Sequence, residues 1–151
     1  MDTITLDPRT ATFSDGLHLL ARVADALQPL VDEDRIGISP GYPGVLVFAH
    51  GDTPEDKKAN GTAAGRIIRD ITGLTVEKRY SDGDVRLRCD IVTHKLAISV
   101  VISGVCTRTV VGTETVDVEK VVSKVVETVT EERDIVEWDC GGGILLNGDE
   151  E

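Results

Sequence analysis

The segment "LTVEKRYSDGDVRLRCDI", residues 74–91, carries the strongest local fold signal in this sequence. At its centre, Asp82-Gly83 is typical of the two-residue loop of a β-hairpin. Such a loop places three apolar pairs opposite each other across the two strands: Tyr80 with Val85, Val76 with Cys89, and Leu74 with Ile91. Because alternate residues of a strand share a face, all six side chains lie on one side, and the segment predicts a hairpin with one buried face.

A third strand is predicted directly after the hairpin. Beyond the four residues "VTHK", apolar residues alternate again, and they fall opposite the second hairpin strand on the same buried face: Leu96, Ile98, Val100 and Ile102 opposite Ile91, Cys89, Leu87 and Val85. Residues 74–103 therefore predict an antiparallel meander of three strands.

The outer face of the same hairpin gathers arginines. The predicted register places Arg79 opposite Arg86, and Glu77 opposite Arg88. Like charges paired across strands are unfavourable, so we expect something to neutralise them. One hypothesis is that the acidic segment after Glu114 folds back over this face, and another is that an external phosphate or a partner's carboxylates bind there. The simplest alternative is that the arginine side chains extend into water at little cost.

Apolar spacing predicts a first helix over residues 15–28, capped by Ser14 and ended by Pro29. The short runs "RIGI" and "VLVFA" predict two strands separated by a turn in "SPGYPG". With the meander, these elements predict an α+β fold in which two helices pack on one face of a mostly antiparallel sheet.

A second helix is predicted over residues 54–72. Its start is signalled by "TPED", in which Thr53 can cap the helix, and Gly73 supplies the usual stop. Gly61 and Gly65 lie inside this helix without the spacing of a phosphate-binding loop, so close packing of the helix is the better explanation for them.

The negative charge is concentrated near the end of the chain. The net charge is −11, and residues 114–151 hold 12 acidic and 3 basic residues, a net charge of −9. We expect one domain over residues 1–151, with an α+β core in 1–113 and an acidic segment in 114–151. The negative net charge disfavours direct binding to nucleic acid or to an anionic membrane.

The acidic segment contains a valine-rich run, "VEKVVSKVVETVTEE". As a strand it has valine on both faces, whereas as a helix Val118, Val121, Val122, Val125 and Val129 form one stripe. We favour a helix over residues 117–127, followed by a strand near "RDIVEWDC". The β-branched residues of the run favour a strand instead of a helix. The final "GGGILLNGDEE" is expected to be a mobile end whose apolar "ILL" can dock.

Two features are candidates for contact with a partner. The first is the arginine group Arg79, Arg86 and Arg88. The second is the valine stripe, which either packs on its own sheet or forms a seam that dimerises or binds a host protein, and its candidate residues are Val118, Val121, Val122 and Val125.

Metal and catalytic chemistry receive little support. Cys89, Cys106 and Cys140 are odd in number and lack CxxC spacing, which favours reduced structural thiols over a disulfide framework or a zinc site. Zinc bound by His94, Cys106 and Cys140 is the less favoured alternative. His50 with Asp52 could be imagined in a hydrolytic or metal site, but a loop histidine before a helix cap explains them better. We predict no cofactor.

Three stretches, "LDPRTATFSDGL", "VCTRTVVGTETV" and "DIVEWDC", resemble small proteins of actinobacterial phages that have no assigned function. The resemblance implies a phage (viral) product acting in the cytoplasm of a bacterial host, and it carries over no catalytic residue. The N-terminal residues lack the pattern of a signal peptide, which also leads us to expect a cytoplasmic protein.

The leading functional hypothesis is a non-enzymatic phage accessory or host-interaction protein that associates with itself. The second is an acidic mimic of DNA that occupies a nucleic-acid-binding protein of the host through five carboxylates: Glu131, Glu132, Asp134, Glu137 and Asp139. A small hydrolase or metal enzyme comes third.

Overall fold

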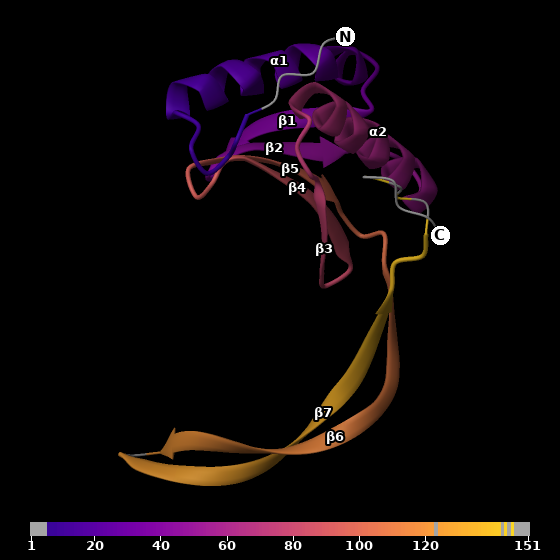
Figure 1. The fold of residues 1–151 in the computed structure, drawn as a ribbon. Helices are drawn as coiled ribbons and strands as arrows, with labels where there is room; N and C mark the ends of the chain where they lie inside the picture. The colour runs from indigo at the N-terminus through magenta and orange to yellow at the C-terminus, as the bar shows by residue number, and fades with distance from the viewer. Residues whose placement is uncertain (1–5, 123, 143, 145, 147–151) are drawn as a thin grey trace.

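The computed structural model describes residues 6–122, 124–142, 144 and 146 of the chain. Figure 1 shows two parts: a domain in which two helices cover one face of a five-stranded sheet, and a long two-stranded ribbon that projects from that domain. The predicted α+β class, with helices on one face of a mostly antiparallel sheet, is confirmed.

Helix α1 (Phe13–Asp32) is longer at both ends than predicted. Thr12 caps it instead of Ser14, because the Thr12 hydroxyl accepts a hydrogen bond of 3.1 Å from the Asp15 N–H. Pro29 does not end the helix. Pro29 removes one N–H from the helix, but the buried Leu30 anchors the last turn to the core.

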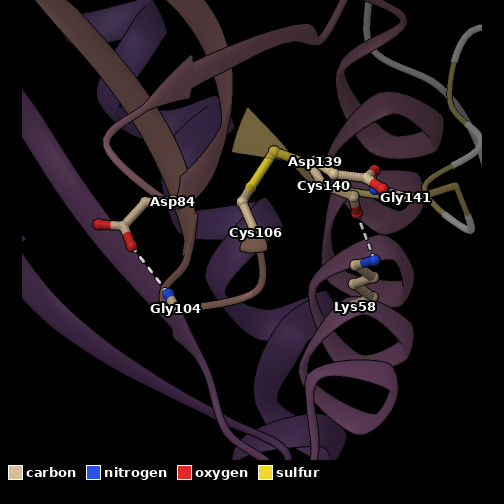
Figure 2. Close-up of a disulfide and its surroundings, with 7 residues drawn as sticks. All are labelled: Lys58, Asp84, Gly104, Cys106, Asp139, Cys140 and Gly141. Carbon is tan, nitrogen blue, oxygen red and sulfur yellow. Dashed lines mark hydrogen bonds between the residues drawn. A yellow bond between two sulfur atoms is a disulfide. The ribbon is translucent and has the colours of Figure 1, made fainter. Parts of the chain in front are cut away.

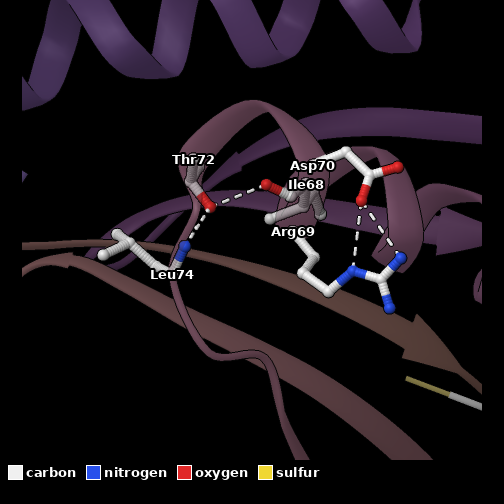
Figure 3. A network of polar contacts seen from close by, with 5 residues as sticks. All are labelled: Ile68, Arg69, Asp70, Thr72 and Leu74. Atoms are coloured by element: carbon white, nitrogen blue, oxygen red, sulfur yellow. Dashed lines mark hydrogen bonds and ion pairs between the residues drawn. The ribbon is translucent and has the colours of Figure 1, made fainter. Parts of the chain in front are cut away.

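Helix α2 (Pro54–Thr72) has the bounds predicted from its signals. The Thr53 hydroxyl accepts from the Asp56 N–H at 3.1 Å, and Gly73 follows in the left-handed conformation with φ 68°. Figure 3 shows the end of this helix: the buried Thr72 hydroxyl donates to the carbonyl of Ile68 at 2.7 Å and accepts from the Leu74 N–H at 3.1 Å. In the same view Arg69 forms an ion pair of 3.0 Å with the neighbouring Asp70.

The sheet has the order β1-β2-β5-β4-β3. Its strands are β1 (Ile36–Gly41), β2 (Gly44–Ala49), β3 (Glu77–Ser81), β4 (Asp84–Val92) and β5 (Leu96–Ile102). Every neighbouring pair is antiparallel except β2 with β5, which is parallel. The turn predicted in "SPGYPG" is shorter than expected, because only Tyr42 and Pro43 lie between the strands β1 and β2.

The Asp82-Gly83 hairpin has the predicted register, with Tyr80 opposite Val85 and Arg79 opposite Arg86. The ladder begins only at Glu77, so the predicted pairs of Val76 with Cys89 and Leu74 with Ile91 are wrong. Tyr80 is also 62% exposed, because it lies at the free edge of the sheet beyond the cover of the helices.

The third strand follows the predicted register over most of its length. Three pairs are confirmed: Val85 with Ile102, Leu87 with Val100, and Cys89 with Ile98. An irregularity between Asp90 and Val92 then shifts the ladder, so Leu96 pairs with Val92 and not with Ile91.

The core lies between the helices and the sheet. Leu19, Val23 and Leu27 of α1 are buried there, as are Ala64, Ile68 and Ile71 of α2. Gly61 permits the close approach that the sequence suggested, since a Cβ at this position would overlap the side chain of Ile102. Gly65 does the same against Leu87, whose Cδ1 would lie 2.9 Å from an added Cβ.

The predicted helix over residues 117–127 is wrong. Strands β6 (Thr107–Val122) and β7 (Val125–Asp139) form an antiparallel ribbon that includes the expected strand near "RDIVEWDC". Ten of the sixteen residues of β6 are valine or threonine, which favour extended backbone. We preferred a helix because a strand would have valines on both of its faces. The ribbon is solvated on both faces, so this pattern does not count against a strand. It also begins before residue 114, the predicted boundary of the acidic segment.

After the ribbon, the chain returns to the core. Ile144 and Leu146 are buried against the domain, as the "ILL" prediction suggested, and Lys78 donates a hydrogen bond of 2.8 Å to the carbonyl of Ile144. Gly143, Leu145 and residues 147–151, which belong to the same predicted stretch, lie outside the described residues.

Candidate interaction surfaces

A clamp fixes the base of the ribbon to the domain. Figure 2 shows its centre, a disulfide bond between Cys106 and Cys140, one position beyond the first ribbon pair. The N–H groups of Val105 and Cys106 both donate to the carbonyl of Gly83, at 3.1 and 3.0 Å. Gly104 N–H donates to the Asp84 carboxylate at 2.8 Å. The Asp82-Gly83 turn therefore holds the chain where the ribbon begins.

Two further contacts hold the end of β7 at the clamp. Lys58 of α2 donates to the carbonyl of Cys140 (Figure 2). The ring of Trp138 lies against Gly83, close enough that a Cβ there would be 3.0 Å from its Cζ3. Trp138 and Tyr80 also line an open hollow of about 370 Å³, which the sequence analysis missed because the two residues are far apart in the chain.

The disulfide bond overturns the expectation of reduced thiols at Cys106 and Cys140. It also removes both sulfur atoms as zinc ligands for His94, which lies in the turn between β4 and β5. Cys89 alone is a free thiol, and burial raises its pKa to about 11. In the described ranges, no group of three or more His, Cys, Asp or Glu side chains is placed to hold a metal ion.

Beyond the clamp the ribbon stands alone. No Cα atom of β6 or β7 lies within 8 Å of a Cα atom in any other helix or strand that the structure describes. Figure 1 shows the ribbon curving away on the side of the sheet opposite the helices. Isolated two-stranded ribbons are only marginally stable in water. A partner that covered the exposed surface of this ribbon would therefore stabilise it.

Outward from the pair of Thr113 with Asp134, one face of the ribbon, here called the acidic face, carries four carboxylates and no basic residue. Nearer the base, Arg108 lies on the same side, opposite Trp138. The register places eight threonine and acidic side chains on it: Thr113, Thr115, Asp117, Glu119, Thr128, Thr130, Glu132 and Asp134. At the outer end of the same face, Val121 lies opposite Val126. These two valines are here called the valine tip. They are 74% and 59% exposed.

The opposite face of the ribbon carries charges of both signs. There Lys120 forms an ion pair of 2.7 Å with Glu131, and Arg133 lies 3.9 Å from the same carboxylate. The hydrogen bond from Lys120 holds the pKa of Glu131 below its ordinary value. Val118 and Val129 pair across this face, and both are half-buried.

The four candidate valines therefore gather in the outer part of the ribbon, although not as a helical stripe. Val118 and Val125 share the opposite face, which has charges of both signs, whereas Val121 is on the acidic face. Val122 pairs with Val125 along the backbone, and its side chain lies outside the described residues.

The three candidate arginines lie on the sheet face that the helices leave uncovered. This open sheet face carries the alternate residues of β2, β5, β4 and β3, notably Leu46, Phe48, Val101, Arg86, Arg88 and Arg79. Within the described part of the chain, no helix or strand packs on it (Figure 1). Apolar side chains occupy its β2 half and arginines its β4–β3 half.

Neighbouring acids neutralise two of these arginines. Arg79 pairs with Glu77 at 2.9 Å, and Arg88 pairs with Asp90 at 3.0 Å, each along its own strand. Arg86 is exposed, and its side chain has no hydrogen bond or ion pair with any residue that the structure describes. The hypothesis that the acidic segment folds back over this face is wrong for the single chain, since no Cα atom of the ribbon strands lies within 8 Å of a Cα atom in β3 or β4.

His50 and Asp52 lie at the end of β2, away from both surfaces. His50 Nδ1 is 3.2 Å from the Asp34 carboxylate, and the His50 carbonyl accepts a hydrogen bond of 2.7 Å from Asn60. An open hollow of about 490 Å³ adjoins them, with Asp52 and Asp56 in its lining. These contacts order the loop before α2, consistent with the structural explanation of the histidine.

The five carboxylates of the DNA-mimic hypothesis do not share one face. On β7, Glu132 and Asp134 belong to the acidic face, whereas Glu131 alternates to the other face. Glu137 and Asp139 lie near the base of the strand with the same alternation as Glu131. This arrangement does not resemble the single row of charges that a mimic of the DNA backbone needs.

No protein-family model, curated protein or solved structure matches this chain. None of the helices among the described residues combines the length and apolar character needed to cross a membrane.

Proposed function

We propose that this chain is a non-enzymatic protein that acts through protein–protein contacts and associates with itself, with the ribbon as the contacting arm. The resemblance to actinobacterial phage proteins supports a role as an accessory or host-interaction protein in the bacterial cytoplasm. The observation that carries the proposal is the ribbon, which projects from a clamped base and packs on no other element in the described chain.

The energetics favour a covered ribbon. Val121, Val125 and Val126 keep more than half of their side-chain surface in water. Burying the remaining surface of each would contribute about 1 to 2 kcal/mol. A folded chain that holds such side chains at the end of a clamped arm presents an interaction surface.

A shortened ribbon tests this proposal. Deleting residues 116–121 and 126–131 removes six facing pairs and leaves the turn and the clamp. Because six is even, the remaining side chains keep their faces. We expect the full chain to sediment above its monomer mass of 16.2 kDa and the shortened chain to sediment as a monomer.

Circular dichroism and thermal unfolding are the controls, because the shortened chain must keep the folded domain. A full chain that stays monomeric at every concentration, and that captures no protein from bacterial lysate, would contradict the proposal.

The acidic face supports a second candidate function, the occupation of a basic surface on a host nucleic-acid-binding protein. Four carboxylates without a basic neighbour on that face are the supporting observation. Complexes formed this way should weaken steeply as salt rises, whereas contacts made by the valine tip should not. Capture from lysate that is insensitive to salt would exclude this candidate.

A further inference from the structure

The ribbon and the open sheet face are complementary in charge. The acidic face has four carboxylates and no base. On the open sheet face, Glu77 and Asp90 pair with Arg79 and Arg88, which leaves Arg86 as the arginine without a partner among the described residues. Arg86 also lies directly opposite Arg79, so a carboxylate placed over the pair would relieve their repulsion.

The two surfaces also match in the order of their apolar and charged parts. Across the sheet, Phe48 of β2 precedes Val101 of β5, and Arg86 and Arg79 follow on β4 and β3. Along the acidic face, the valine tip precedes Glu119, which precedes Asp117. Each surface therefore passes from apolar to charged in one direction.

The spacings agree as well. Strands lie about 4.8 Å apart, so β4 is about 10 Å and β3 about 14 Å from β2. Residues on one face of a strand recur about every 7 Å, which places Glu119 about 7 Å and Asp117 about 13 Å from Val121. With Val121 against Phe48 (39% exposed), the carboxylates of Glu119 and Asp117 fall near Arg86 and Arg79.

The ribbon cannot make this contact within its own chain. The disulfide bond and the Gly83 hydrogen bonds fix its base beside the β3–β4 turn, and no Cα atom of its strands lies within 8 Å of a Cα atom in the strands of the sheet. At 16 residues, β6 spans about 50 Å, more than the width of about 19 Å expected for a five-stranded sheet. It is therefore long enough to cross the sheet of a second molecule.

We infer that the acidic face and valine tip of one copy dock across the open sheet face of a second copy of this chain. This inference rests on the proposed self-association and specifies its interface. The ribbon crosses the strands of the second copy, with its valines on the β2 half and its carboxylates on the arginine half.

Reversing charges on each surface tests the interface. Arg86→Glu removes the unpaired cation, and it also places a carboxylate opposite Arg79, which favours the folded chain. Asp117→Lys combined with Glu119→Lys reverses the acidic face. We expect each variant alone to self-associate at least about tenfold more weakly, because like charges then meet at the interface.

Mixing the two variants supplies the decisive measurement. In the mixture, the lysines of one variant meet the carboxylate that Arg86→Glu introduces in the other variant, and they can do so only across the interface. The unchanged open sheet face of the lysine variant can likewise bind the unchanged acidic face of the Arg86→Glu variant. We expect the mixture to recover the mass of the unmodified assembly in sedimentation velocity. Arg22→Glu on the exposed face of α1 and Glu137→Lys near the ribbon base are matched controls, which should associate like the original chain.

The outcomes separate this inference from the proposed function. If shortening the ribbon produces a monomer but neither charge reversal weakens association, the ribbon mediates contact elsewhere and this interface is wrong. A folded mixture that stays dissociated, although each variant alone is weakened, also overturns it. If the unmodified chain is itself monomeric, the proposed self-association fails first.

Discussion

Breaking the disulfide bond is expected to loosen the base of the ribbon while the domain stays folded. The bond joins residues 34 positions apart in sequence. For a loop of that length, the chain-entropy model gives a stabilisation of about 4 kcal/mol at 25 °C. This is an upper value for the opening of the ribbon base, because the Gly83 hydrogen bonds and the Trp138 contact remain after reduction.

Hydrogen exchange measures this effect directly. The amides of Val105 and Cys106, which bond to Gly83, should exchange up to several hundredfold faster in the reduced chain than in the oxidised chain. Amides in the middle of α2 should change much less, since Cys106 and Cys140 are only partly buried and pack against the core without belonging to its buried residues. The reduced original chain is the cleanest comparison, because it keeps both sulfur atoms in place.

Equal exchange rates at Val105 and Cys106 in the two forms would refute this reasoning. That result would mean that the hydrogen bonds and Trp138 alone hold the base of the ribbon. A large increase throughout α2 would refute it differently, because it would show that the clamp and the core unfold as one unit.

Three further predictions concern the domain. Thr72→Val should lower the free energy of unfolding by about 1 to 3 kcal/mol in urea titrations, because the Leu74 N–H and the Ile68 carbonyl lose their shared hydroxyl; an unchanged midpoint would show that the bonds are dispensable. Gly61→Ala should lower the melting temperature despite the better helix propensity of alanine, since the added methyl group overlaps Ile102. Cys89 has a higher pKa in the folded chain, about 11, than the ordinary 9.0, so its stabilising contribution is complete below pH 9.0 and is lost as the pH rises to about 11. The original chain should therefore lose about 2 kcal/mol more stability between pH 9 and pH 11 than Cys89→Ala, and parallel losses would contradict the buried thiol.

The domain could be predicted from sequence where local signals were unambiguous. Asp82-Gly83 allows one loop geometry, which set the register and placed Arg79 opposite Arg86. Thr53 and Gly73 marked both ends of α2. The stop predicted at Pro29 is wrong because the burial of Leu30 in the core outweighs the hydrogen bond that a proline removes from a helix.

The ribbon was harder to predict because its valines fit two periodicities. In a strand exposed on both faces, alternation carries no information about burial, so the helical stripe was the clearer pattern. Cys106 and Cys140 gave no signal as a pair, since only the strand pairing brings them together. The arginine face was predicted from the register, whereas its relation to the acidic face needed the three-dimensional arrangement.

The ribbon leaves and re-enters the core at fixed points, between the buried Val105 and the buried Ile144. A length of chain held this way behaves as an adjustable spacer. Facing pairs can be added or removed at its far end, two at a time, without disturbing a single core contact. Such a design would let selection set the distance between neighbouring molecules independently of the stability of each one.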